Sequence, residues 1–223
     1  MLFLLNIIFA VAIIILTYKY FELKERYNCE EIADQDYLKG ISTIFDENEF
    51  YTIPHSAKVA EEAEKISRIL ELDENQIKSI KLASYLHDCG ESLYKSDFLK
   101  QAGPLSEGEW QLLKFHPCLG ERALRGTLQL SDDVPSIIRW HHEWWDGSGY
   151  PDNLAGEQIP LASRILTVAD AACAMSCDRP YRQAFSPEQI DYELEKMSGI
   201  MFDPSIVKAR MSTKKLKVLS EKK

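Results

Sequence analysis

The sequence contains no Cys-x-x-Cys pair, no internal repeat, and no polar–apolar alternation long enough to predict a β-strand. Its five cysteines are an odd number without paired spacing, which argues against a disulfide framework and fits a reducing compartment. Acidic residues outnumber basic ones by 35 to 26, and the net charge of −9 argues against a large nucleic-acid-binding surface. Without strand patterns, the prediction is an all-α domain.

The N-terminal segment is a long apolar run. Residues 2–16 are interrupted only by Asn6, and with residues 17–21 the run approaches the ~20 residues that cross a bilayer as a helix. A buried core helix and a cleaved signal peptide are the alternatives, but the run has no polar face, no preceding basic side chain and no clear cleavage site. We therefore predict a single transmembrane anchor over residues 1–21. The basic residues after the apolar run 2–16, Lys19, Lys24 and Arg26, place the main domain in the cytoplasm.

The rest of the chain is dominated by helical periodicity. We predict a linker that becomes a helix over residues 22–44, one domain over residues 45–211, and a basic tail over residues 212–223. Three residue pairs have the spacing of a helix N-terminus: Asp73 with Gln76, Ser106 with Glu109, and Ser186 with Gln189. The helix after Ser106 is expected to reach His116, where Pro117 bends it or starts a new one. A loop is predicted over residues 146–160 and a strongly apolar helix over residues 161–175.

The chain has only five histidines, and each lies at or near a predicted helix end. His141 and His142 run directly into a turn that ends in Gly149-Tyr150-Pro151; the others are His55, His87 and His116. Two adjacent neutral imidazoles offer a metal two nitrogen ligands, and the other three could converge on the same place in a helical bundle. A core or surface role is the ordinary alternative for any one histidine. Five at such junctions favour a metal site.

Asp170 is surrounded by apolar residues within the predicted helix 161–175. An unpaired carboxylate there would cost several kcal/mol, which a metal ion or an arginine partner would remove. The arginines available for such a salt bridge are Arg164, Arg179 and Arg182. Cys173 and Cys177, four residues apart on the same helix, could bind zinc, although two buried free thiols are the simpler interpretation.

Five imidazoles with the carboxylates of Asp88 and Asp170 are more ligands than one tetrahedral zinc needs, but they suit two ions that share a bridging ligand. Histidine combined with carboxylate suits Fe or Mn, with Zn as a third option, better than Mg or Ca. Two ions about 3.5–4 Å apart activate a bridging hydroxide and stabilise an in-line displacement at phosphorus. Phosphoester hydrolysis is therefore the first reaction class to consider.

Several short segments together resemble the HD-GYP domain, a branch of the HD superfamily of metal-dependent phosphohydrolases. They occur in the family's order across residues 45–211, and the joint match is highly specific. The segments are His55–Ala60, His87–Gly90, Phe115–Pro117, His141–Pro151, Val168–Asp170, Asp178–Arg182 and Phe202–Pro204.

This resemblance implies an HD-superfamily helical bundle that hydrolyses cyclic di-GMP to linear pGpG, and in some members to GMP. By position, one metal ion would take His55, His87 and Asp170 and the other His116, His141 and His142, with Asp88 as the bridging, catalytic carboxylate. Gly149, Tyr150 and Pro151 would shape the lip of the substrate pocket, and Arg179 and Arg182 would contact the substrate phosphates unless they pair with Asp178 or Asp170. Some relatives hold a third metal through a glutamate where this chain has Tyr51, so two metal ions are expected.

Two positions depart from the family pattern. Glu91 stands where relatives usually have a lysine near the scissile phosphate, and Cys173 stands where they commonly have an aspartate that contacts guanine. Glu91 could turn away from the site or act as an additional metal ligand. The departures keep two alternatives open: a catalytically weak module that binds a partner protein or the nucleotide, and a hydrolase of another cyclic dinucleotide or phosphoester. The expected partners are a cyclic dinucleotide, the membrane through the N-terminal helix, and a protein of second-messenger signalling.

Overall fold

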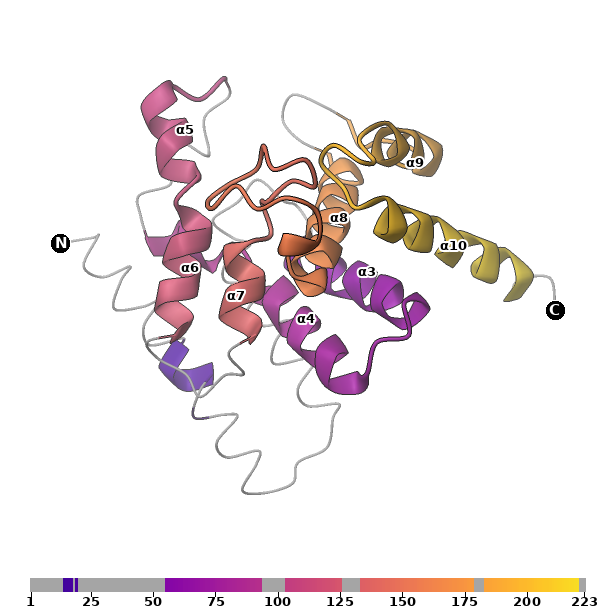
Figure 1. Ribbon diagram of the computed structural model, residues 1–223, viewed down its shortest axis with the longest axis horizontal. Coiled ribbons are helices and arrows are strands. Elements are labelled where there is room, and N and C mark those ends of the chain that lie inside the picture. The colour runs from indigo at the N-terminus through magenta and orange to yellow at the C-terminus, as the bar shows by residue number, and fades with distance from the viewer. Residues whose placement is uncertain are drawn as a thin grey trace.

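The computed structural model describes residues 14–17, 19, 55–93, 103–125, 133–178 and 183–220, with side chains up to residue 212 (Figure 1). Within these ranges the named elements are all helices, as predicted. They are α3 (His55–Ile69), α4 (Glu74–Leu86), η1 (Cys89–Leu93), α5 (Glu107–Leu113), α6 (His116–Arg125), α7 (Asp133–Arg139), η3 (Gly156–Gln158), α8 (Leu161–Met175), α9 (Pro187–Lys196) and α10 (Pro204–Ser220).

Several predictions fall on other parts of the chain. The linker over residues 22–44, Tyr51, Arg179 and Arg182 lie outside the described residues. The same holds for most of the anchor over residues 1–21, which stays a prediction. Among the helices that the structure describes, none combines the length and apolar character needed to cross a bilayer.

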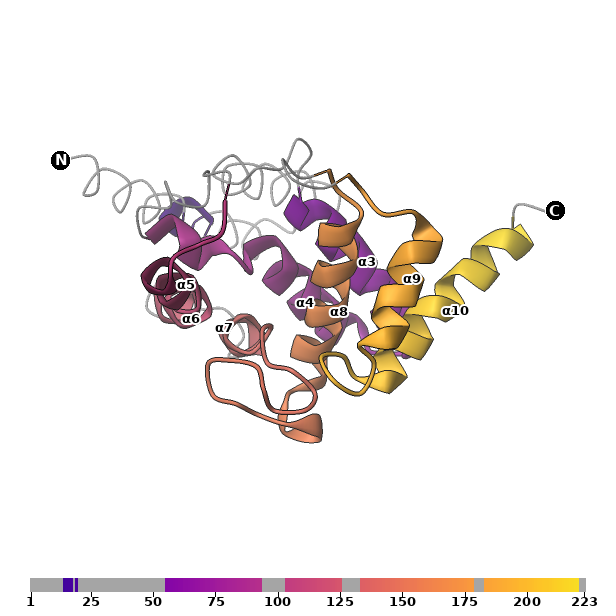
Figure 2. The ribbon, with the colours of Figure 1, turned by 90° about the horizontal axis from the view of Figure 1, so that it is seen from above.

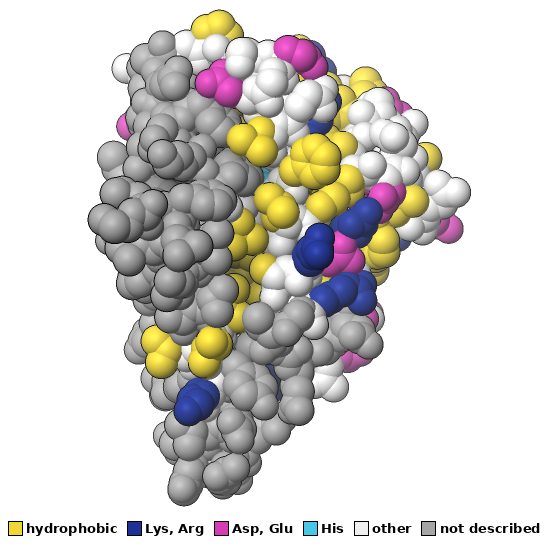
Figure 3. Space-filling view, turned by 90° about the vertical axis from the view of Figure 1, so that its left-hand side faces the viewer, with side chains coloured by type: hydrophobic (Ala, Val, Ile, Leu, Met, Phe, Trp, Pro, Cys, Tyr) yellow, Lys and Arg dark blue, Asp and Glu magenta, His cyan; other side chains and the backbone are white. Residues whose placement is uncertain are grey.

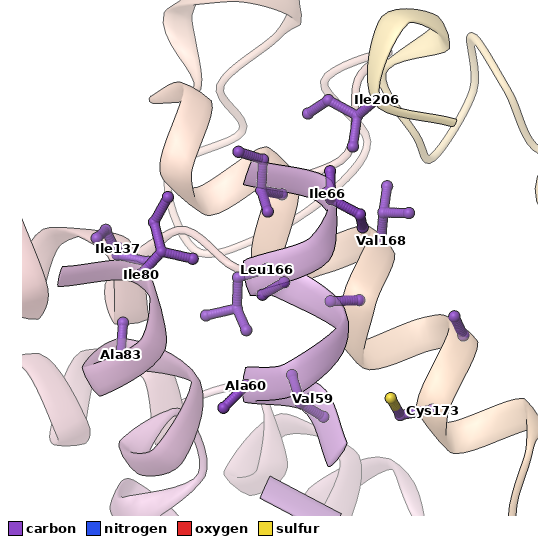
Figure 4. Close-up of a cluster of buried hydrophobic side chains, with 14 of the residues drawn as sticks. Val59, Ala60, Ile66, Ile80, Ala83, Ile137, Leu166, Val168, Cys173 and Ile206 are labelled. Carbon is purple, nitrogen blue, oxygen red and sulfur yellow. The ribbon is translucent and has the colours of Figure 1, made fainter. Parts of the chain in front are cut away.

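The centre of the fold is formed by α3, α4 and α8. Helix α3 packs against both α4 and α8, while α5 and α6 lie at one end of the molecule and α9 and α10 at the other (Figures 1 and 2). Ile66, Ile80 and Leu166, one from each central helix, are almost completely buried and belong to a single cluster (Figure 4). Each such aliphatic side chain contributes about 1.5–3 kcal/mol on burial. The cluster holds in a rigid frame the three helices that position His55, His87 and Asp170.

The helix starts follow the predicted capping signals. Asp73, Ser106 and Ser186 are N-caps, and each forms a reciprocal capping box with the residue three positions later. The apolar helix has the predicted bounds, Leu161–Met175. Helix α5 ends at Leu113 and a separate helix begins at His116, so the second of the two outcomes expected at Pro117 is the one observed.

The C-terminal segment differs from the expectation of a simple tail. Helix α10 continues to Ser220 and so covers most of residues 212–223. This segment contains neither glycine nor proline, and lysine is a good helix former, so nothing in its sequence ends the helix earlier. The start of the helix is held by the buried Asp203, whose carboxylate accepts hydrogen bonds from the backbone N–H and the hydroxyl of Ser205.

Candidate metal centre

Seven predicted ligand side chains meet at the ends of the central helices. His55 begins α3, His116 begins α6, and Asp170 lies on α8. The other ligands follow helix ends directly: His87 and Asp88 come after α4, and His141 and His142 come just after α7. Local sequence places each ligand at a helix terminus or on a helix face, and the packing of five helices brings them to one place.

His55, His87 and Asp170 form the first group of ligands, with all their ligand atoms within 4.8 Å of one another. Asp170 Oδ1 lies 2.9 Å from His55 Nε2 and 3.8 Å from His87 Nε2. Both histidines are buried. The group joins residues that are 115 positions apart in the chain.

Asp88, His116, His141 and His142 form the second group, whose ligand atoms also lie within 4.8 Å of one another. His116 Nε2 lies 3.4 Å from His141 Nε2 and 3.3 Å from Asp88 Oδ1. The other carboxylate oxygen, Asp88 Oδ2, lies 2.7 Å from His87 Nε2 in the first group. Asp88 therefore faces both groups, as expected for a bridging ligand.

Three of the histidines are oriented in the same way. The Nδ1 atoms of His87, His116 and His141 each lie within hydrogen-bond distance of a backbone carbonyl three residues earlier. The acceptors are the carbonyl oxygens of Ser84, Leu113 and Ile138, at 2.8, 2.7 and 2.6 Å. Because a carbonyl oxygen can only accept, Nδ1 carries a proton, and in the neutral imidazole the lone pair is then on Nε2, which faces the centre. Such hydrogen bonds fix metal-binding imidazoles in the ligating tautomer.

The electrostatics of the centre keep its carboxylates ionised. Burial raises the pKa of Asp88, but the neighbouring His87 and His116 outweigh this effect and hold the pKa well below its usual range. The pKa of Asp170 is also lowered, because the hydrogen bond from His55 and the charge of His87 outweigh burial. Both aspartates are therefore ready to bind a cation.

Two histidines of the second group, His141 and His142, are neutral. Burial lowers the pKa of His141 to about 3, and the positive charges of His116 and His87 act in the same direction. Burial and the neighbouring His141 also hold the pKa of His142 well below its usual value. A neutral imidazole is the ligating form, so these two histidines need no proton release to bind a metal, whereas Asp88 raises the pKa of His116, which gives up its proton when it ligates.

One atom tests directly whether these residues fit a metal ion. His87 Nε2 is buried, and among the described residues it makes no hydrogen bond of acceptable geometry, although Asp88 Oδ2 is only 2.7 Å away. A buried polar atom without a hydrogen bond is costly. A cation between His87 and the carboxylates would satisfy it, and two histidine–carboxylate groups with a shared aspartate suit Fe, Mn or Zn.

Comparison with known proteins bears on what this cluster is. Residues 40–206 match the model of the HD domain family. The chain belongs to the HD domain family. The resemblance to the HD-GYP branch of this family is confirmed by the similarity of the chain to the following named proteins. The cyclic di-GMP phosphodiesterase response regulator RpfG of Xanthomonas campestris is 38% identical over 65% of this chain and 38% of its own length. The 3'3'-cGAMP-specific phosphodiesterase 2 of Vibrio cholerae is 36% identical over 69% of this chain and 30% of its own length.

Solved structures show the same fold. A cyclic GMP-AMP-specific phosphodiesterase of Vibrio cholerae superposes with a TM-score of 0.62 at 22% identity, over 80% of this chain and 48% of that one. The HD-GYP-type protein Bd1817 of Bdellovibrio bacteriovorus gives 0.60 at 15% identity, over 82% and 62%. The chain spans less than half the length of the curated relatives named above.

In this HD-GYP chain the Gly-Tyr-Pro turn packs directly on a metal-ligand histidine. The ring of Tyr150 is stacked on that of His142, with centroids 4.9 Å apart, and Tyr150 N–H donates to the His142 carbonyl at 3.1 Å. Gly149 allows this approach: a Cβ there would lie 2.2 Å from Trp144 N and 2.6 Å from His142 O. The turn, whose Tyr150–Pro151 peptide bond is cis, therefore orients a ligand in addition to any role in forming the pocket lip.

Glu143 is a positioning residue that sequence reasoning did not single out. It is 1% exposed, and its carboxylate accepts backbone hydrogen bonds from Asp152 at 2.6 Å and Leu154 at 3.0 Å. Burial raises the pKa of Glu143 although these hydrogen bonds oppose the rise. The side chain ties the loop after the turn to the residue next to His142. The signal was present in the sequence as an acidic residue directly after the histidine pair.

Gly90 has a second role that its sequence context did not reveal. Glycine commonly ends a helix, and α4 ends at Leu86, shortly before Gly90, while η1 begins at Cys89. The structure adds a close contact, because a Cβ on Gly90 would lie 2.0 Å from the His116 carbonyl oxygen and 2.8 Å from Gly120 N. Only glycine lets η1 cross the first turn of α6 at this distance, which brings Asp88 close to His116.

The structure bears on two alternatives from the sequence: a salt bridge between Asp170 and an arginine, and zinc binding by Cys173 and Cys177. Arg164 forms an ion pair with the buried Asp203 and not with Asp170. Arg179 and Arg182, the other two arginines, lie outside the described residues. Among the described residues, the ligand groups include neither Cys173 nor Cys177, so the zinc-binding alternative for this pair finds no support there.

The two departures from the family pattern lie in different surroundings. Burial raises the pKa of Glu91 to about 7, and the charge of Asp88 adds to the rise while His116 opposes it. Glu91 is thus within electrostatic reach of the centre, but among the described residues it belongs to neither ligand group. Cys173 is 7% exposed and belongs to the hydrophobic core between the helices (Figure 4).

Proposed function

We propose that this chain is a metal-dependent phosphodiesterase that hydrolyses a cyclic dinucleotide, with cyclic di-GMP as the first candidate and linear pGpG as its product. The observation that carries the proposal is the pair of buried ligand groups joined by the two oxygens of Asp88. The names of the HD-GYP relatives, which include cyclic di-GMP and 3'3'-cGAMP phosphodiesterases, support the substrate class.

The residues have distinct tasks in this reaction. His55, His87 and Asp170 would hold one divalent ion and His116, His141 and His142 the other, with Asp88 between them. Bound there, the ions would supply an activated water and neutralise charge on the attacking and leaving oxygens. The Nδ1 hydrogen bonds keep the imidazoles aligned, and burial excludes bulk water from around the ligands.

The chemical balance is that of a hydrolysis. One water molecule is consumed, its oxygen bonds to phosphorus, and the bond from phosphorus to the 3′ oxygen breaks. The 3′ oxygen takes a proton, and the ring opens to a linear dinucleotide with a 5′ phosphate. Hydrolysis of the second phosphodiester by the same steps would yield GMP.

The direct test is turnover together with metal content on one sample. The protein is purified without metal, loaded with Fe(II) or Mn(II), and incubated with cyclic di-GMP, and nucleotides are separated by chromatography. We expect pGpG from the wild type, and loss of both metal and turnover in Asp88→Asn. Asp133→Asn, a matched change of an exposed aspartate at the start of α7, should behave as the wild type. No turnover of the wild type with either metal would refute the proposal.

A second candidate is a signalling module that binds the nucleotide or a partner protein with little turnover. Glu91 favours it, because an acidic side chain where relatives have a lysine offers a phosphodiester no attraction and repels it when ionised. Glu91→Lys separates the two: a large gain in turnover supports the weak module, whereas no change from an already efficient rate excludes it. Competition between cyclic di-GMP and 3'3'-cGAMP in the same assay determines which cyclic dinucleotide is preferred.

A further inference from the structure

Lys114 lies beside the metal-ligand cluster without belonging to it. The residue stands between α5 and α6, two positions before His116. Its ammonium nitrogen lies 5.8 Å from the centroid of the Tyr150 ring and 5.6 Å from that of Trp110. Tyr150 is in turn stacked on His142. Two aromatic faces therefore hold a positive charge one ring away from a metal ligand.

Among the described residues, the ammonium group of Lys114 has no acidic partner, whereas the neighbouring arginines do. Within the described ranges, Lys114 forms no ion pair with a carboxylate. The arginines around the same loop are engaged: Arg139 pairs with Glu121 and Asp152, and Arg164 pairs with Asp203. An aromatic face attracts an ammonium group but occupies none of its three N–H donors fully. Lys114 thus keeps donors for an anion.

The surface around Lys114 is suited to a nucleotide. Helix α5 has no buried residue, and Trp110 is 42% exposed. On this side of the molecule hydrophobic side chains gather in a band, with a group of basic and acidic side chains beside it (Figure 3).

We propose that Lys114 binds a phosphodiester group of the cyclic dinucleotide, with its ammonium group held in place by Tyr150 and Trp110. The inference rests on the proposed function, because it names a substrate contact of the same site. Lysine is a common phosphate-binding residue and acts there as a point charge. Tyr150 then has two roles: its ring packs on the metal ligand His142, and the same ring positions the ammonium group of Lys114.

The test measures binding separately from turnover. The probe is a hydrolysis-resistant phosphorothioate analogue of cyclic di-GMP, and its affinity for the Mn(II)-loaded protein is measured for the wild type, Lys114→Gln, Lys114→Arg and Lys196→Gln. Lys196 is an exposed lysine on α9 that pairs with Glu193, so it serves as the matched control. Metal content and thermal midpoint are recorded for every variant.

We expect Lys114→Gln to weaken the affinity about tenfold, as loss of a charge-assisted hydrogen bond should, and to weaken its dependence on salt. Lys114→Arg should retain most of the affinity and Lys196→Gln all of it. An affinity of Lys114→Gln within twofold of the wild type would overturn the inference, and so would a loss of metal in that variant. A wild type that binds the analogue but does not hydrolyse cyclic di-GMP refutes the proposed reaction alone. A wild type that does not bind it refutes both.

Discussion

The contact between the Gly-Tyr-Pro turn and His142 leads to a quantitative prediction for Gly149→Ala. The new methyl group would lie 2.2 Å from Trp144 N and 2.6 Å from Glu143 Cα and His142 O, and all three are backbone atoms. Since no flexible side chain can give way, the turn itself must move. Movement breaks the Tyr150 N–H to His142 hydrogen bond and the ring stacking above it.

The expected cost follows from these contacts. Overpacking costs about 1–3 kcal/mol, the lost backbone hydrogen bond about 1 kcal/mol, and the lost ring contact about 0.5–1.5 kcal/mol. The terms overlap because one movement relieves the clash and breaks both contacts, so we expect a loss of about 2–4 kcal/mol in the free energy of unfolding. For a chain of this size that corresponds to a thermal midpoint about 5–15 °C lower.

The assay is thermal unfolding with metal analysis of the same samples. The control is Gly108→Ala in α5, where a Cβ meets no atom within 4 Å and alanine should be neutral or stabilising by up to about 1 kcal/mol. Gly149→Ala should also bind less metal, because His142 loses the contacts that orient it. A Gly149→Ala protein that melts like the wild type and retains all its metal would show that the turn does not brace the centre.

Three further predictions concern the residues around the ligands. Gly90→Ala should lower the free energy of unfolding by about 3 kcal/mol, because its methyl group would overlap the His116 carbonyl; urea unfolding would reveal a smaller effect if η1 can move away. Glu143→Gln should cost about 1–3 kcal/mol, since an amide can accept with only one of its two terminal atoms, and hydrogen exchange of the Asp152 amide should quicken. The hydrogen bond from Arg139 holds the pKa of Asp152 below its ordinary 3.8, so this pair stabilises the fold fully above pH 3.8 and the stabilisation disappears as the pH falls through the lower folded-state pKa. The difference in unfolding free energy between the wild type and Arg139→Gln should therefore shrink below pH 3.8, and a constant difference would contradict the assignment.

Local sequence was sufficient for the helices and for most of the ligand set. Capping boxes at Asp73, Ser106 and Ser186 predicted helix starts correctly because they involve hydrogen bonds between residues only three positions apart. The apolar helix over residues 161–175 was predicted for a similar reason, since the run is apolar throughout and ends near polar residues. Five histidines at helix ends favoured a metal site before any tertiary contact was known.

Contacts between distant segments were beyond the sequence. The ion pair between Arg164 and Asp203 joins residues 39 positions apart, and nothing in the sequence near Arg164 shows that its partner is Asp203 and not Asp170. The second role of Gly90 depends on α6 crossing it, and the proposed role of Lys114 depends on Tyr150 lying above it. Each requires the packing of helices whose relative positions are determined by the whole core.

The sequence by itself determined the type of fold, the residue types of the centre and the expectation of two metal ions that share a bridging ligand, since these depend on periodicity, capping and ligand chemistry. The family resemblance already divided the ligands between two ions, and the tertiary structure alone decided how they are oriented: it placed one oxygen of Asp88 toward each group, set Nε2 of three histidines toward the centre, and put the Gly-Tyr-Pro turn behind His142. The physical reason is that a ligand's identity is local, whereas its direction depends on which backbone carbonyl, ring or helix packs against it.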